Sequence, residues 1–374
     1  MRRRRESGGQ ARPGALSRLY LCAVLGGLAA GAAPAAAAEP CTPGDDRCRF
    51  IAASGVGMTT SLGNPDSALL ATIHRRLTGT SSQPEPAYPV KAAPPSAFPE
   101  LVWGRIVGRV GSIDATEDTP ATDMRGGGAF VGIDLPYDAA TRYGIAGGFS
   151  RSSIEDTTDN KIEADGYHIS AYATHAEGAW RLRGIASYAY YDLESRRSVS
   201  LGRGNFGHPE ADYASSNVEA LGELSYVAPL GIGTVEPYAA AGISWLYTGA
   251  YTETGDAGIQ SDLTVQDSSQ VWPYVTLGAR FAASFEAAGM SFVPTLDLGW
   301  RHVFGDIDPT VGYDIPSRGD FAISGVPIAE DTFVLGLGLD TGFANGWRGS
   351  LKYLGEIADT ADAHTFSAGL AIPF

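Results

Sequence analysis

The chain has 374 residues, of which 44% are hydrophobic and 18% are charged, so it is long enough for one large β domain or two smaller ones. Its formal net charge is -15, and this acidic balance argues against nucleic acid as a partner. Beyond the N-terminal segment there is no run of about eighteen uncharged apolar residues, so a membrane role cannot rest on helices, whereas the weaker pattern of β-barrel strands remains compatible with the sequence.

Residues 1–38 have the pattern of a secretory signal peptide. Arginines precede an apolar run that begins at Leu19, and the small residues Ala35–Ala38 follow this run. The pattern predicts cleavage after Ala38 and not a transmembrane anchor, because the apolar run is short and ends in a small-residue cleavage site. The sequence therefore predicts export from the cytoplasm.

Residues 39–63 form a short segment that contains two cysteines. Cys41 and Cys48 are separated by a Pro-Gly turn. In an exported chain this spacing predicts a disulfide loop, and a pair of free thiols is the alternative. Metal binding by these thiols with Asp45 and Asp46 is a further hypothesis, but nothing else nearby has ligand spacing. The sequence predicts neither a metal site nor a cofactor.

Residues 64–78 are expected to form the one convincing helix after the signal peptide, as a lumen plug or linker helix. Asn64 suits the cap position, and Arg75 and Arg76 are expected in the last turn. The apolar positions on one side of this helix are Leu69, Leu70, Ile73 and Leu77. Residues 79–100 are rich in proline and predict a stiff, extended tether.

From Leu101 to the end, residues 101–374 alternate with a period of two. Turn signals divide this part into about twelve strands: 101–112, 126–136, 141–153, 162–176, 179–193, 213–228, 234–249, 271–286, 290–304, 331–343, 346–357 and 363–374. Short and long connections alternate, and the strand number is even. The sequence thus predicts an all-β fold, an antiparallel transmembrane β-barrel whose two ends are periplasmic.

The two faces of these strands differ in charge. One face is apolar, with aromatic residues such as Trp180 near the short-turn side and Tyr190 near the long-loop side, as at the two interfaces of a bilayer. The other face carries charges of both signs, which predicts a charged lumen: Arg105, Arg109, Arg142, Arg181, Arg183, Glu219, Glu223, Glu236, Arg280, Asp297, Arg301, Asp340, Arg348 and Lys352.

These inward charges have two interpretations. A bracing network is favoured over a selectivity filter, because selective pores concentrate charges of one sign. A related hypothesis has Arg75 and Arg76 docking on Glu219, Glu223 or Glu236.

The last strand must have both of its edges paired, because an amphipathic strand at a chain end is otherwise exposed along one edge. We expect it to pair with strand 346–357 and with the strand that opens at Leu101. Its apolar face comprises Phe366, Leu370, Ile372 and Phe374.

Six segments resemble the autotransporter β-domain, the translocator barrel of type V secretion. They are Leu101-Val-Trp-Gly-Arg-Ile-Val-Gly, Gly126-Gly-Gly-Ala-Phe-Val-Gly-Ile-Asp, Tyr143-Gly-Ile-Ala-Gly-Gly-Phe-Ser-Arg-Ser, Gly299-Trp-Arg-His-Val-Phe-Gly-Asp, Gly325-Val-Pro-Ile-Ala-Glu-Asp and the terminal Ala-Gly-Leu-Ala-Ile-Pro-Phe. The resemblance implies a twelve-stranded pore in the outer-membrane lipid of a Gram-negative bacterium. It also implies insertion by a barrel-assembly machinery that reads the last strand, with Phe366, Leu370, Ile372 and Phe374 as the assembly signal.

The segment between the predicted signal peptide and the barrel is much shorter than the passengers usual in this family. Our leading interpretation is a translocator with a very short or vestigial passenger, whose N-terminal segment is periplasmic, luminal or surface-exposed. The alternative is a stand-alone adhesin or porin-like barrel that acts through its extracellular loops.

An outer-membrane hydrolase that uses His168, His175 or His302 with Asp306 or Asp308 is the third hypothesis. Because these histidines do not share one predicted site, the sequence predicts no catalytic residues.

Overall fold

The computed structural model describes residues 68–81, 101–115, 120–202, 205–255, 263–307, 309–315, 319–324 and 327–373. The predicted signal peptide, Cys41, Cys48 and Phe374 lie outside these residues, as does most of the predicted tether. Within them, no helix is long and apolar enough to cross a membrane.

Helix α3 spans Ala68–Ser81. It continues to Ser81, past the expected end of the helix at residue 78. For the same reason Arg75 and Arg76 lie in the middle of the helix and not in its last turn.

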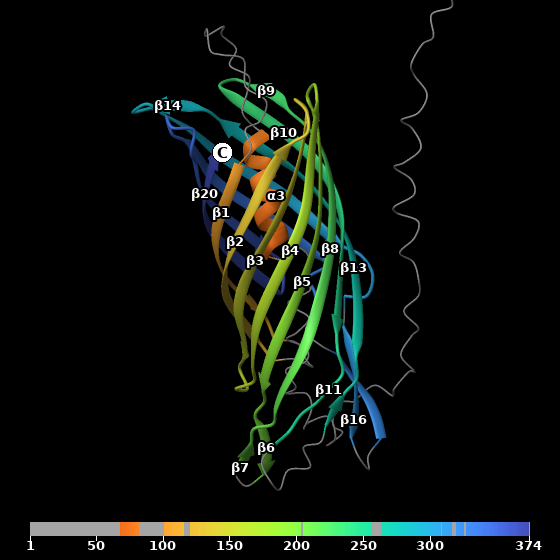
Figure 1. Cartoon of the computed structure of the whole chain (residues 1–374). Coiled ribbons are helices and arrows are strands. Elements are labelled where there is room, and N and C mark those ends of the chain that lie inside the picture. The colour runs from red at the N-terminus through yellow and green to blue at the C-terminus, as the bar shows by residue number, and fades with distance from the viewer. Residues whose placement is uncertain are drawn as a thin grey trace, which may run out of the picture. The chain divides into compact units, whose positions relative to one another are not determined.

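Twelve antiparallel strands form a closed barrel, as the sequence predicts (Figure 1). They are β1 (Leu101–Ile113), β2 (Thr122–Pro136), β3 (Thr141–Asp156), β4 (Lys161–Glu177), β5 (Trp180–Arg196), β8 (Glu210–Tyr226), β10 (Gly233–Thr248), β13 (Ser268–Ala283), β15 (Met290–Val303), β18 (Asp331–Gly342), β19 (Arg348–Ile357) and β20 (Ala361–Pro373). Each pairs with the next in this order. The pairing of β1 with β20, from Leu101 opposite Pro373 to Ile113 opposite Ala361, closes the barrel.

The two ends of the barrel differ in how the strands are joined. Tight turns join β4 to β5 and β18 to β19 at one end, where Gly178 and Gly346 have φ angles of 57° and 85°, a conformation that favours glycine. Short extensions of the hairpins also lie at this end: β9 (Ala228–Leu230) and β14 (Phe285–Ala287). The opposite end carries the long connections and their small strands: β6 (Val199–Gly202), β7 (Asn205–Gly207), β11 (Tyr251–Thr252), β12 (Thr264–Val265), β16 (Thr310–Ile315) and β17 (Gly319–Ser324).

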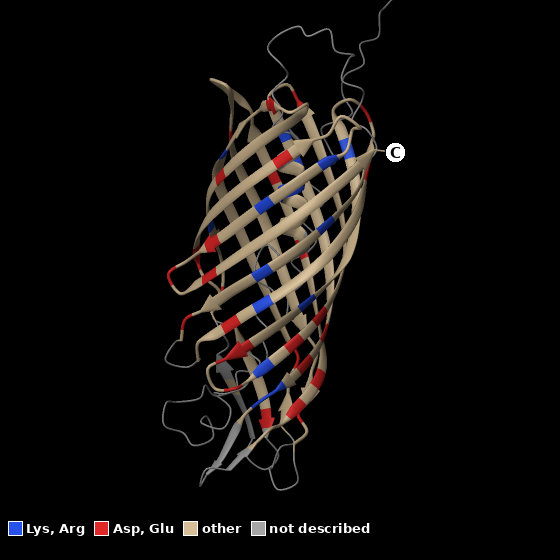
Figure 2. Cartoon of the chain, turned by 90° about the vertical axis from the view of Figure 1, so that its left-hand side faces the viewer, with Lys and Arg blue, Asp and Glu red and all other residues tan. Residues whose placement is uncertain are grey.

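The outer face changes character along each long strand. On β5 the exposed outward residues run from Trp180 to Tyr190 and are mostly apolar, a stretch of about eleven residues that matches the length of a tilted transmembrane strand. Beyond Tyr190 the outward residues are Asp192, Glu194 and Arg196. Figure 2 shows acidic residues gathered toward this end of the barrel, away from the C-terminus. The strands therefore continue past the apolar band into water.

The barrel interior is apolar where the outer face is charged. Ile154, Ile162 and Leu193 are completely buried there. Side chains from the long connections join them, and Tyr251 of β11 stacks on Tyr213 of β8 with ring centroids 4.0 Å apart. Beyond the apolar band the outer face of the barrel is therefore charged and the inner face is apolar. An apolar cluster fills the lumen at the long-loop end.

Candidate functional site in the barrel lumen

Helix α3 lies inside the barrel, in the half that carries the short turns (Figure 1). Leu70, Ile73 and Leu77 are at most 1% exposed and belong to the same apolar cluster as the barrel wall. A helix of 14 residues is marginal in water by itself, so packing against the wall stabilises it.

The direction of α3 follows from its contacts with β18 and β19. Ala71 packs with Val334 and Leu354, whereas one turn later the backbone carbonyl of Arg75 accepts a 3.2 Å hydrogen bond from Lys352 Nζ. Because β19 starts at the short-turn end, Leu354 lies farther from that end than Lys352 does. The N-terminal end of α3 is therefore directed toward the long loops.

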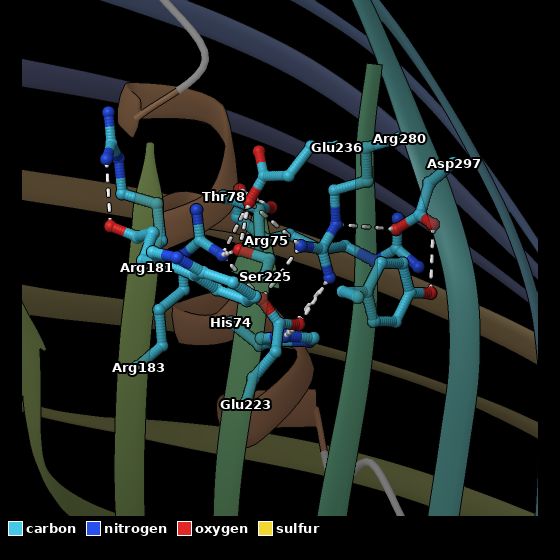
Figure 3. A network of polar contacts seen from close by, with 12 residues as sticks. His74, Arg75, Thr78, Arg181, Arg183, Glu223, Ser225, Glu236, Arg280 and Asp297 are labelled. Carbon is cyan, nitrogen blue, oxygen red and sulfur yellow. Dashed lines mark hydrogen bonds and ion pairs between the residues drawn. The ribbon is translucent and has the colours of Figure 1, made fainter. Parts of the chain in front are cut away.

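Glu223 of β8 is the centre of a buried network of charges (Figure 3). Its carboxylate lies 2.5 Å from a guanidinium nitrogen of Arg183 and 2.5 Å from one of Arg280. His74 of α3 contacts the same carboxylate at 2.6 Å. Glu223 thus joins the helix to the barrel wall.

The register of the strands extends this network around the wall. Glu236 of β10 lies 2.7 Å from Arg183 and accepts a 2.6 Å hydrogen bond from the Ser225 hydroxyl. Arg280 lies opposite Glu236 on one neighbouring strand and opposite Asp297 on the other, which it contacts at 3.3 Å. Each charge of this network contacts at least one partner of opposite sign, which offsets the cost of burying it.

A second network holds the other side of the helix. Asp134 of β2 is completely buried and lies 2.5 Å from Arg76 of α3 and 3.3 Å from Arg142 of β3. The Tyr172 hydroxyl donates a 2.6 Å hydrogen bond to Asp134 and accepts one of 2.8 Å from Trp103. The Arg76 guanidinium lies 5.0 Å from the centre of the Trp103 ring, in cation–π geometry.

These contacts correct the docking hypothesis for Arg76. Arg76 binds Asp134, and the helix residue on Glu223 is His74. Sequence reasoning missed Asp134, although it stands one position from the outward residues Ile133 and Leu135, so strand alternation places it in the lumen.

The remaining predicted lumen charges lie apart from these two networks. Arg109 and Arg301 meet on Glu356, another residue that sequence reasoning missed. Arg181 donates hydrogen bonds to backbone carbonyls at the short turn. Glu219 is buried and accepts a 3.5 Å hydrogen bond from Ser187. The fourteen residues predicted as lumen charges are therefore distributed over several sites.

Three residues of the predicted assembly signal lie on the outer face of β20, and the fourth, Phe374, lies outside the described residues. Phe366, Leu370 and Ile372 are 58%, 41% and 36% exposed. Their role in assembly stays a prediction.

The histidines considered for hydrolysis lie at different places. His168 is buried and hydrogen-bonded to Ser150, His175 contacts Thr141 near a short turn, and His302 contacts Asp331. In the part of the chain that the structure describes, no group of three His, Cys, Asp or Glu side chains is placed to hold a metal ion.

Comparison with known proteins places the barrel in a family. The family model described as "Autotransporter beta-domain" matches residues 102–353. The structure is similar to the translocator domain of autotransporter NalP from Neisseria meningitidis, with a TM-score of 0.64, 18% identity, and coverage of 86% of this chain and 100% of that one. It is also similar to the β domain of the Bordetella autotransporter BrkA, with a TM-score of 0.54, 18% identity, and coverage of 74% of this chain and 100% of that one.

Among curated proteins, an extracellular serine protease of Serratia marcescens is 23% identical over 274 residues, which are 73% of this chain and 26% of the protease. The chain thus spans about a quarter of the length of this relative. The family model covers more than half of the chain, and the barrel has the strand number and closure of the solved translocator domains. The chain belongs to the autotransporter β-domain family, the outer-membrane barrels of type V secretion.

Proposed function

We propose that this barrel translocates the segment that precedes α3 and displays it, as a short passenger, on the cell surface. The direction of α3 carries the proposal, because its N-terminal end points toward the long loops. In outer-membrane barrels the longer loops are extracellular and the short turns periplasmic. The segment that precedes α3 therefore leads from the N-terminal end of the helix toward the cell surface.

Two anchors support a helix that stays in the lumen after translocation. His74 on Glu223 and Arg76 on Asp134 attach α3 to two separate parts of the wall, on β8 and on β2. Both carboxylates are at most 1% exposed, and breaking a buried pair typically costs about 3–5 kcal/mol. The helix thereby retains the displayed segment and occupies part of the lumen in the half that lies toward the periplasm.

An epitope tag inserted after Ala38 tests this proposal. On intact cells the tag should be bound by antibody and removed by an added protease. A tag inserted at Gly346, in the turn between β18 and β19, is the matched control and should stay protected until the outer membrane is permeabilised. A protected tag after Ala38 in a correctly inserted barrel would refute surface display.

A second candidate function is a stand-alone barrel that acts through its long connections. This function is favoured because the long connections contain regular structure. β12 pairs with β11 and with β16. Arg197, which follows β5, forms a buried ion pair with Glu253, which follows β11. Such a built surface suits binding to an extracellular partner. Replacing the connection between β11 and β12 by a short glycine linker should abolish adhesion but leave surface display of the tag intact.

A further inference from the structure

A cavity of about 490 Å³ opens between α3 and the wall formed by β1, β18, β19 and β20. Three guanidiniums line it: Arg76 of the helix, Arg105 of β1 and Arg348 of β19. The carboxylate of Asp340 also lines the cavity. The cavity is therefore rich in positive charge.

Two of the three guanidiniums have no carboxylate partner among the described residues. Arg76 is paired with Asp134, and Asp340 is paired with Lys352 at 3.0 Å. Arg105 is only 6% exposed and donates hydrogen bonds to the hydroxyls of Ser350 and Ser367, each at 3.1 Å.

Arg348 makes no hydrogen bond or ion pair within the described residues. Arg76 repels both Arg105 and Arg348, whereas Asp340 attracts both without contacting either. Elsewhere in the lumen, Arg183, Arg280 and Arg301 each contact a carboxylate. Arg105 and Arg348 differ from these three arginines in having no carboxylate in contact.

Arg105 is buried and Arg348 is half-buried, and a guanidinium removed from water without a carboxylate in contact is costly. The geometry of a guanidinium suits the two oxygens of a carboxylate or phosphate group. The Thr341 hydroxyl also lines the cavity and has no hydrogen-bond partner among the described residues. The rest of the lining includes the apolar side chains of Trp103, Phe343 and Trp347. Cavities of this volume accept small organic molecules.

We propose that the cavity binds an amphipathic anion, whose carboxylate or phosphate group lies between Arg105 and Arg348 and whose hydrocarbon part packs on Trp103, Phe343 and Trp347. The shared chemistry is that of a fatty acid and of a lipid phosphate. This site is independent of the display of the N-terminal segment, because it requires only the folded barrel with its helix.

Binding to the full-length protein in an uncharged maltoside detergent tests the proposal, with native mass spectrometry as the readout. The probes are dodecanoate, dodecyl phosphate, dodecanol and inorganic phosphate. Dodecanoate or dodecyl phosphate should bind at least tenfold more tightly than dodecanol and inorganic phosphate, because only these probes combine the charge with the hydrocarbon. The tighter of the two anions identifies a fatty acid or a lipid phosphate as the source.

Variants locate the site. Arg105→Gln combined with Arg348→Gln should weaken binding at least tenfold, and so should Arg348→Gln alone, which removes no hydrogen bond of the fold. Arg181→Gln is the matched control, since Arg181 does not line the cavity, and it should bind normally. Equal binding of dodecanol, equal binding of inorganic phosphate, or unchanged binding in Arg348→Gln would each overturn the proposal.

Discussion

Replacing Asp134 with asparagine should destabilise the folded barrel by about 3 kcal/mol. Asp134 is completely buried and is shared by Arg76, Arg142 and Tyr172. Asparagine preserves the shape and can still accept the Tyr172 hydrogen bond, but it leaves two buried guanidiniums without this negative charge. Removal of one partner from a buried pair costs about 3–5 kcal/mol, and the retained hydrogen bond favours the lower value.

Asp165→Asn is the matched control for this substitution. Asp165 of β4 also pairs with an arginine across two strands, contacting Arg151 of β3 at 2.7 and 3.0 Å. This pair lies on the outer face, with side chains 31% and 67% exposed. Exposed ion pairs contribute about 0–1 kcal/mol, so the control should lose at most that amount.

Unfolding in guanidinium chloride, followed by tryptophan fluorescence, measures both losses, because the free energy of unfolding extrapolates linearly to zero denaturant. The variant Arg76→Ala combined with Asp134→Asn completes the comparison. If the loss arises from the unpaired charge of Arg76, Asp134→Asn should cost less in the Arg76→Ala background. Equal losses for Asp134→Asn and Asp165→Asn would refute the argument from burial.

Three further predictions concern other parts of the barrel. Tyr251→Ala should cost about 3 kcal/mol locally and make the connection between β11 and β12 sensitive to protease, because it leaves a cavity beside Tyr213; an equally resistant connection would argue against the packed cluster. Deletion of Phe374 should reduce the amount of barrel in the outer membrane far more than it alters the stability of the refolded barrel, and normal surface levels would show that the terminal residue is ordinary. At the short turn between β2 and β3, hydrogen bonds from the backbone N–H groups of Ala140 and Thr141 lower the pKa of Asp138. Its carboxylate therefore stabilises the turn above its unfolded pKa of about 3.9, and this contribution is lost as the pH falls through the lower folded value. The difference in stability between the protein and Asp138→Ala should accordingly vanish in strong acid, and a difference that persists there would contradict this role.

The sequence determined the barrel itself and the face on which most charges lie. Alternation of apolar and other residues is a local property, so strands such as β5 and β20 were predictable from their own residues. The same alternation places Glu223 and Arg280 in the lumen. In β2 the alternation that places Phe130 in the lumen also places Asp134 there, four positions later.

Only the tertiary structure decided which of these groups meet. Arg76 reaches Asp134 because of the depth and direction at which α3 lies in the lumen, and neither is encoded in the spacing of the two residues. Likewise, Arg183 faces Glu223 because the stagger of the closed sheet sets their register. The exchange of polarity beyond Tyr190 also needed the structure, since the apolar side chains that cover the inner face of β5 there come from connections distant in the sequence. Strand identity follows from neighbouring residues, whereas partners within a closed barrel follow from how the whole sheet is wound.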